Sequence, residues 1–197
     1  MAIVAIHPQR ITGNWKSGIA LDFHTTSSTP IGPNEYGHMQ FDTIRPEIAE
    51  LLYQLKYRND QNAAKSIIDT AADFLAPRRN NFELIIPVPA STERAIQPVL
   101  VLATGIGEAL RVPVNPCVTP TRPTTQLKSV TDPNERKVLL HDLYTVEKAQ
   151  TRGKRILLFD DLFRSGATMN AITDLLLTEG RAGTVLVLTI TRTRINQ

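Results

Sequence analysis

The sequence is poor in the residues that build several common kinds of site. It has one cysteine, Cys117, among 197 residues, so neither an internal disulfide nor a cysteine zinc site can form. We interpret Cys117 as a small buried hydrophobic residue, the usual place of a free cysteine. The four histidines, His7, His24, His38 and His141, lack the spacing of metal ligands. We therefore expect no metal site built from the protein's own side chains.

Long hydrophobic runs are missing as well. No apolar run approaches the ~20 residues that a membrane helix needs. The apolar piece at the start, Ala2–Ile6, is too short for a signal peptide. With 42% hydrophobic and 21% charged residues, the composition is typical of a soluble globular protein. We expect a cytoplasmic protein with no membrane contact, large enough for one domain with its own core.

Aromatic residues make up only 6% of the chain, and the formal net charge is a mild +3. The positive charge is concentrated between Arg111 and Lys154, where eight lysines and arginines face four acids and one aromatic residue, Tyr144. Such a segment fits a polyanionic small ligand or a nucleic acid. Because aromatic side chains for base stacking are scarce, nucleic acid is the weaker alternative.

Apolar runs and helical spacing alternate along most of the chain. The runs are typical of buried parallel strands, and the alternation predicts an α/β fold with a central, mainly parallel sheet and helices on both faces. The expected strands are residues 83–88, 112–118, 156–159 and 184–191, with apolar content also over 141–146, and the expected helices are residues 45–58, 63–75, 96–110 and 169–179.

The N-terminal part has a different pattern. Ala2–Ile6 and Ser17–His24 are expected to form two short strands, and Thr25–His38 reads as an exposed loop rich in threonine, serine, proline and glycine. This part is too small to bury a core of its own. We expect one domain, with a small β appendage over residues 1–44 and the α/β part over residues 45–197.

The stretch Arg155–Met169 reads RILLFDDLFRSGATM and carries the most chemistry. Its apolar run leads into Asp160 and Asp161, at the carboxyl end of a predicted strand, where open parallel sheets bind their ligands. Adjacent carboxylates on an extended backbone diverge, so they can accept hydrogen bonds from vicinal hydroxyls such as those of ribose.

The loop that follows, residues 163–168, is suited to a phosphate. Gly166 allows close approach of the backbone, and the start of the next helix offers N–H groups. Ser165 and Thr168 add hydroxyl donors, and Arg164 adds positive charge. We therefore predict a site for a phosphorylated ribose.

This stretch resembles the phosphoribosyl-pyrophosphate (PRPP) motif of type I phosphoribosyltransferases: four apolar residues, two acids, two apolar, two variable, then Gly-x-Thr. The resemblance implies that family's fold with a small N-terminal hood, and Asp160 and Asp161 as catalytic residues facing the ribose. Phe163 is larger than the usual aliphatic residue, and Arg164 replaces an acid common in purine enzymes, which argues against a purine acceptor. The implied 5-phosphate loop is Arg164, Ser165, Gly166, Ala167 and Thr168.

Two further segments extend the resemblance. Residues 85–92, IIPVPAST, look like the pyrophosphate-binding strand and loop, and residues 119–137 look like a flexible loop that closes over the site. The order of motifs from about residue 45 to 194 is similar to the competence protein F (ComF) family, although the cysteine zinc ribbon common there is absent. The implied pyrophosphate residues are Ala90, Ser91, Thr92 and Arg94, and the implied flexible-loop residues are Arg122, Lys128 and Arg136.

The resemblance implies a phosphoribosyltransferase that takes PRPP as its magnesium complex and releases pyrophosphate. A non-catalytic PRPP or nucleotide sensor and a competence-like DNA-processing accessory protein remain alternatives. The acceptor is left open, since its pocket would lie in the appendage; Trp15, Phe23 and Tyr36 are better explained by packing than by base stacking. Lys56 lies in the predicted helix 45–58, before the IIPVPAST motif, and is as well explained by a solvated surface charge as by a role in the site. A homo-oligomer is compatible with this reading.

Overall fold

The computed structural model describes residues 3–90, 97–122, 140 and 142–194. Their central element is a five-stranded sheet in the order β1-β2-β9-β8-β5. Strands β2, β9, β8 and β5 are parallel, and only β1 is antiparallel to its neighbour. The strands are β1 (Gln9–Arg10), β2 (Ser17–Phe23), β5 (Leu84–Pro87), β8 (Arg155–Phe163) and β9 (Thr184–Arg192). The predicted α/β fold with a mainly parallel sheet is confirmed.

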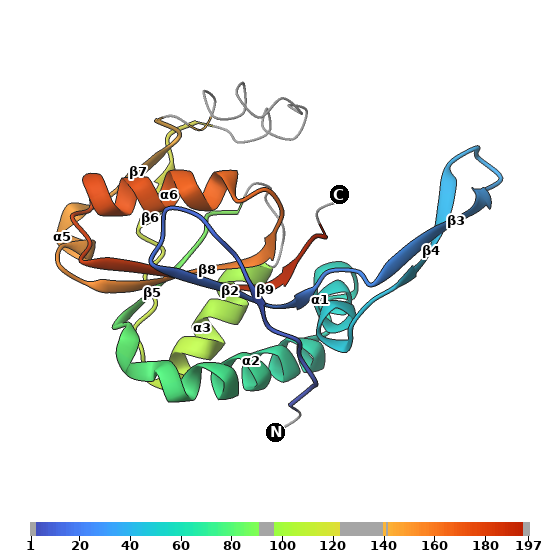
Figure 1. Ribbon diagram of the computed structural model, residues 1–197, viewed down its shortest axis with the longest axis horizontal. Helices are drawn as coiled ribbons and strands as arrows, with labels where there is room; N and C mark the ends of the chain where they lie inside the picture. The colour runs from blue at the N-terminus through green and yellow to red at the C-terminus, as the bar shows by residue number, and fades with distance from the viewer. Residues whose placement is uncertain (1–2, 91–96, 123–139, 141, 195–197) are drawn as a thin grey trace.

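Helices cover both faces of this sheet (Figure 1). α6 lies on one face, and α1, α2 and α3 lie on the other. The helices are α1 (Glu47–Arg58), α2 (Gln61–Leu75), the 3-10 helix η1 (Ala76–Asn81), α3 (Pro98–Leu110), α5 (Lys148–Thr151) and α6 (Ala167–Thr178). The four predicted long helices are confirmed. No helix in the described part of the chain combines the length and apolar character that a bilayer crossing requires.

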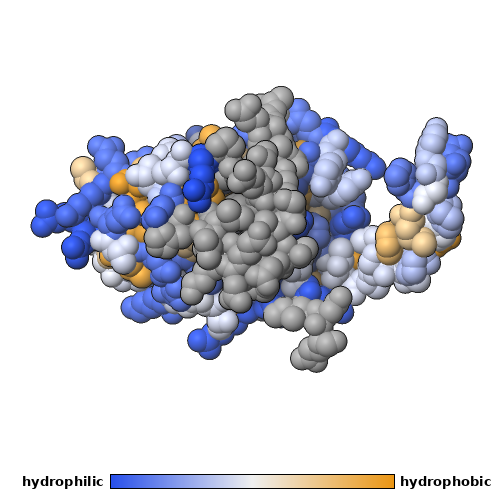
Figure 2. All heavy atoms as spheres, turned by 90° about the horizontal axis from the view of Figure 1, so that it is seen from above, coloured by the Kyte–Doolittle hydropathy of each residue, from blue (hydrophilic) through white to orange (hydrophobic). Residues whose placement is uncertain are grey.

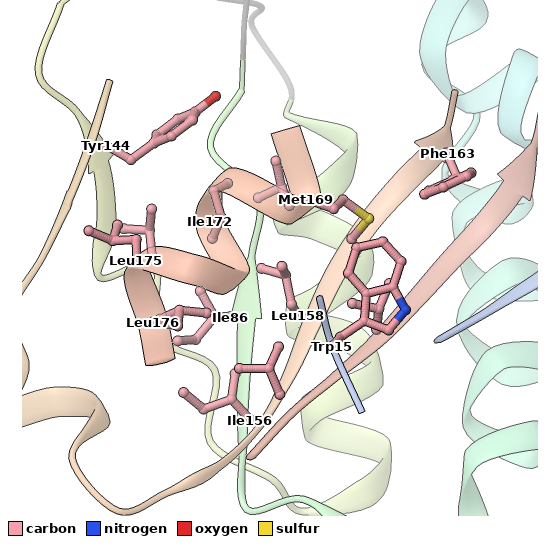
Figure 3. Packing of buried hydrophobic residues seen from close by; sticks show 14 of the residues in the cluster. Trp15, Ile86, Tyr144, Ile156, Leu158, Phe163, Met169, Ile172, Leu175 and Leu176 are labelled. Atoms are coloured by element: carbon pink, nitrogen blue, oxygen red, sulfur yellow. The ribbon is translucent and has the colours of Figure 1, made fainter. Parts of the chain in front are cut away.

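Strand β8 is buried on both faces because its side chains alternate between two cores. Leu158 packs with Met169 and Ile172 of α6, as Figure 3 shows. Phe159, the next residue, belongs to the core under α1–α3, which also holds Leu52 of α1. A strand with apolar neighbours on both sides reads as a continuous apolar run, which is why the sequence pattern predicted it.

β8 is longer than predicted. It was expected to end at Phe159, but its pairing with β9 continues through Asp160, opposite Thr189, to Phe163, opposite Arg192. Because β9 reaches equally far, the acids keep a hydrogen-bonding partner strand beside them. The connection to α6 therefore shrinks to residues 164–166, and α6 begins at Ala167 rather than two residues later.

The N-terminal expectations need correction. The described part of the predicted first strand, residues 3–6, contains no strand, and β2 is part of the central sheet, parallel to β9. The predicted loop Thr25–His38 is wrong. β3 (Ser27–Pro33) and β4 (Met39–Ile44) pair as an antiparallel hairpin that projects from the body (Figure 1). Figure 2 shows hydrophobic residues on its surface, and exposed apolar side chains there include Ile31, Met39 and Phe41.

The predicted strand 112–118 is only partly present. Val114 makes an isolated parallel bridge to Ile85, and a regular strand, β6 (Val118–Pro120), begins only at the end of the predicted range. β6 pairs with β7 (Tyr144–Val146) in a separate antiparallel ribbon. Pro113 and Pro116 explain the interruption, because proline cannot donate a hydrogen bond to a neighbouring strand.

Candidate functional site at the carboxyl edge of the sheet

The carboxyl ends of four parallel strands meet at one edge of the sheet. Just past β5, the Val88 N–H donates to the Phe159 carbonyl at 2.8 Å, so the chain leading to Ala90 leaves the sheet beside the acid pair. Just past β2, the His24 N–H donates to the Arg192 carbonyl of β9 at 2.7 Å. Asp160 and Asp161 of β8 therefore lie between the segment after β5 and the ends of β9 and β2.

The two acids have separate surroundings. The Asp161 carboxylate lies 2.7 Å from the ammonium of Lys56 on α1. Asp160 precedes it on the strand, so its side chain points to the opposite face, and its Oδ1 accepts a hydrogen bond from the Asp161 N–H at 2.8 Å. One acid is thus paired with a cation, while the other is held by a neutral donor.

Lys56 belongs to this site and is not a solvated charge. Its side chain is 14% exposed and that of Asp161 is 13% exposed. Loss of either partner of an ion pair this far from water would destabilise the fold, because the remaining charge would be buried without compensation. The pair also ties the C-terminal part of α1 to the strand that carries the acids.

Asp160 has an unusual protonation equilibrium. Burial, followed by the nearby negative charge of Asp161, raises the pKa of Asp160 to about 8. The hydrogen bond from the Asp161 N–H and the charge of Lys56 act in the opposite direction but do not cancel this effect. At neutral pH the carboxyl group is mainly neutral, so it can donate one hydrogen bond as well as accept others.

This raised pKa predicts a pH-dependent effect of Asp160→Asn. Folding retains a proton that the unfolded chain releases above about pH 4, so this group's contribution to stability falls as pH rises through about 4 to 8. Asparagine has no such proton, so the variant should gain on the order of 5 kcal/mol over the wild type at pH 8 and almost nothing at pH 4.

Urea denaturation at both pH values measures this difference. Asp42→Asn, at an exposed carboxylate on the β3–β4 hairpin, is the matched control. If the stability difference between the wild type and Asp160→Asn were the same at pH 4 and pH 8, the raised pKa of Asp160 would be contradicted.

The short loop after β8 has a tightly constrained backbone. Gly166 has a φ of +77° and is the N-cap of α6, which has no side-chain cap. A Cβ at this position would lie 2.9 Å from ring atoms of Phe163, and Phe163 in turn packs edge-on against Trp15, with ring centroids 6.1 Å apart (Figure 3). Glycine is required both by the conformation and by this contact. The first N–H groups of α6 are left for an external acceptor.

The other predicted residues of the phosphate loop follow from this geometry. Arg164 and Ser165 are exposed, while Ala167 and Thr168 lie in the first turn of α6 and are partly buried. The Ser165 hydroxyl is 3.5 Å from the Ala167 N–H, at the limit of a hydrogen bond. All of them lie within seven positions of Asp161 along the chain.

The remaining predicted residues divide into two groups. Ala90 is exposed beyond β5, and Arg122 is exposed beyond β6. Ser91, Thr92 and Arg94 of the predicted pyrophosphate loop and Lys128 and Arg136 of the predicted flexible loop lie outside the described residues. In the described ranges, no three His, Cys, Asp or Glu side chains come together in a way that could hold a metal ion.

His24, which the sequence pattern did not single out, lies at the same edge. Burial lowers its pKa, and the charges of Lys56, Arg45 and Arg164 lower it further, against the opposite effect of Asp161. Thr191 connects His24 to the acid pair, because its hydroxyl lies 3.2 Å from Nδ1 of His24 and 3.3 Å from the Asp161 carbonyl. One signal was present in the sequence, since His24 ends a predicted strand, but that strand was assigned to the appendage rather than to the sheet.

A groove of about 350 Å³ lies elsewhere, along the C-terminal part of α3 between Leu100 and Pro116. α3 starts after the carboxyl end of β5 and runs back along the sheet, so its C-terminus lies toward the opposite edge. This groove does not belong to the site around the acids.

No family model and no curated protein matches the sequence. Among solved structures, the chain is similar to adenine phosphoribosyltransferase from Saccharomyces cerevisiae, with 17% identity, a TM-score of 0.49 and coverage of 84% of this chain and 82% of that chain. The Trypanosoma brucei enzyme has 14% identity and a TM-score of 0.49, and the match covers 95% of this chain and 86% of that chain. The Giardia lamblia enzyme has 12% identity and a TM-score of 0.42, and the match covers 86% of this chain and 94% of that chain. At these identities the likeness concerns the course of the chain, and the chemistry rests on the side chains described above.

Proposed function

We propose that the chain is a phosphoribosyltransferase-type enzyme that binds PRPP and transfers its phosphoribosyl group to an acceptor. The observation that carries this proposal is the junction of β8 and α6. It places two carboxylates with separate surroundings, then a glycine loop and an uncapped helix start, at the ligand-binding edge of a parallel sheet.

Each part of PRPP has a counterpart at this edge. The 5-phosphate would lie on the loop from Arg164 to Thr168, where N–H groups and positive charge favour it. The ribose hydroxyls would face the acids: the charged Asp161 accepts hydrogen bonds, and the mainly neutral Asp160 both donates and accepts. Pyrophosphate would lie at the segment that starts at Ala90, beside β8, with Ser91, Thr92 and Arg94 as predicted partners.

In the proposed reaction the bond between the anomeric carbon and the pyrophosphate oxygen breaks, and a bond from the acceptor to that carbon forms. Positive charge develops on the sugar, and negative charge moves to the leaving pyrophosphate. The protein stabilises both charges by fixed groups that are already in place before the reaction. The predicted flexible loop with Arg122, Lys128 and Arg136 would provide closure and positive charge.

Magnesium would enter this site as part of the PRPP complex. The described residues offer no cluster of three suitable ligands, so the ion would depend on the oxygens of PRPP itself, where it neutralises charge on the leaving pyrophosphate. A position in the ComF-like family, a cytoplasmic location and a homo-oligomeric state remain predictions from the sequence.

Isothermal titration calorimetry with magnesium and PRPP tests the proposal. The wild-type protein should bind, and Asp161→Asn should weaken binding about tenfold, because a charged hydrogen-bond acceptor is lost. Asp42→Asn, on the hairpin, is the control and should bind as the wild type does.

Two other outcomes have definite meanings. No heat of binding with the wild-type protein would contradict the proposal. Tight binding without pyrophosphate release against a broad panel of acceptors would favour the alternative function, a PRPP sensor that regulates a partner.

A further inference from the structure

His24 lies on the side of β8 that faces away from the predicted pyrophosphate segment. In the sheet order β2-β9-β8-β5, β5 flanks β8 on one side, and β9 and β2 lie on the other. A leaving group over the end of β5 and a nucleophile that approaches from the opposite side of the anomeric carbon put the acceptor over the ends of β9 and β2. His24 immediately follows β2 at that edge.

The contacts of Thr191 favour a proton on Nδ1 of His24. The Thr191 hydroxyl donates to the backbone carbonyl of Asp161 at 3.3 Å, and a carbonyl can only accept. The same hydroxyl oxygen lies 3.2 Å from Nδ1 of His24. Since its hydrogen is already donated, this oxygen accepts from Nδ1–H. Nε2 of a neutral His24 is then unprotonated and available as a base.

Charges from three parts of the fold act on His24. Lys56 of α1, Arg45 of the turn between β4 and α1, and Arg164 of the loop after β8 lower its pKa, while the charge of Asp161 of β8 raises it. The two immediate backbone neighbours on β9 are Thr191, already described, and Arg192, whose guanidinium donates to the Arg10 carbonyl at 3.1 Å. The excess of cations, together with burial, disfavours the imidazolium form.

We propose that His24 accepts the proton of the acceptor during phosphoribosyl transfer, so that the acceptor is a nucleophile with a dissociable N–H or O–H, bound over the ends of β9 and β2. This inference rests on the proposed function. It also supplies a base at this edge of the sheet, where the PRPP motif has Arg164, which cannot take a proton.

The step balances with these groups alone. The acceptor's lone pair forms the bond to the anomeric carbon, and the bonding pair to pyrophosphate leaves with the pyrophosphate oxygen. The acceptor's proton passes to Nε2 of His24, which becomes an imidazolium while Nδ1–H stays bonded to Thr191. The surrounding cations favour the later release of this proton to solvent.

Water is the acceptor probe that needs no knowledge of the natural one. With magnesium and PRPP alone, pyrophosphate release should be faster with the wild-type protein than in buffer, and it should rise with pH through an apparent pKa below 6.5, the ordinary value for histidine. His24→Asn retains a donor toward Thr191 but no base, so release should fall about 100-fold and lose this pH dependence. Thr191→Val should reduce pyrophosphate release less than His24→Asn does, because the His24 imidazole loses its hydrogen-bond partner but is still present.

Controls separate this inference from the proposed function. His38→Asn, at an exposed histidine of the hairpin, should leave release unchanged. PRPP affinity, measured by calorimetry, should stay within about twofold of the wild type in His24→Asn. Absence of PRPP binding by the wild-type protein would count against the proposed function, whereas normal PRPP binding with unchanged release in His24→Asn would count against the role of His24 alone. Long-range proton–nitrogen NMR at pH 7 should show neutral His24 with the proton on Nδ1.

Three results would overturn the role of His24. They are wild-type release no faster than in buffer, release by His24→Asn with an unchanged pH profile, and an NMR spectrum with the proton on Nε2 or on both nitrogens.

Discussion

We expect Lys56→Met to lower the free energy of unfolding by about 3 kcal/mol at pH 7. Lys56 lies 2.7 Å from Asp161, and both side chains are largely removed from water. Methionine keeps most of the side-chain volume but leaves the Asp161 carboxylate unpaired and next to Asp160. Urea denaturation at pH 7 measures the loss, and PRPP binding should weaken with it, because α1 loses its link to the strand that carries the acids.

The chain contains a matched control for this prediction. Lys65 lies 2.8 Å from Asp69, but its side chain is 69% exposed. Because exposed helical pairs of this kind contribute little, Lys65→Met should cost less than about 0.5 kcal/mol. The double variant Lys56→Met/Asp161→Asn should recover most of the stability lost in Lys56→Met. Equal losses at Lys56 and Lys65 would show that burial of the first pair has no energetic consequence.

Gly166→Val should weaken PRPP binding about a hundredfold, as expected when a binding group is displaced by about 1 Å. The φ of +77° disfavours any β-branched residue, and a Cβ would lie 2.9 Å from the Phe163 ring. Relief of this contact moves either the loop or Phe163, and both hold the start of α6 in place. Calorimetry with magnesium and PRPP measures the loss of affinity.

Gly153→Val is a control that separates backbone strain at a positive φ from the contact with Phe163, the two causes of weaker PRPP binding in Gly166→Val. Gly153 has a similar φ of +72°, but a Cβ there would meet no atom within 4 Å. The variant should therefore lose about 1–2 kcal/mol of stability through its backbone and bind PRPP as the wild type does. A Gly166→Val protein that is folded and binds PRPP normally would contradict the placement of the phosphate.

The β8–α6 stretch was predictable because its signals are local. A buried parallel strand must be apolar on both faces, and Gly166 is followed at once by helical spacing, so strand, loop and helix can be read from neighbouring residues. The end of β8 was not predictable in this way. Asp160 and Asp161 are polar, yet they stay in the strand because β9 continues beside them, and that partner lies more than twenty positions away along the chain.

The predictions for the β3–β4 hairpin and for the position of β2 were wrong because the strands that pair with these segments cannot be identified from neighbouring residues. Residues 25–38 contain two prolines and two glycines that mark a loop locally, while the pairing of β3 with β4 depends on a partner strand that follows them. β2 was assigned to an appendage because it is close in sequence to this segment. Its actual neighbour in space is β9, near the other end of the chain.

The amino-acid sequence by itself determined the α/β class, the acid pair and the glycine loop, because each depends on the periodicity or chemistry of residues that are close in the chain. Only the tertiary structure decided that Lys56 pairs with Asp161 and that His24 lies at the same edge of the sheet. The order of strands in a sheet is decided by packing between distant segments; His24 and Thr191, for example, are 167 positions apart. The residues of the proposed phosphoribose site could therefore be predicted from the sequence, whereas the groups around the proposed acceptor position were found only in the folded chain.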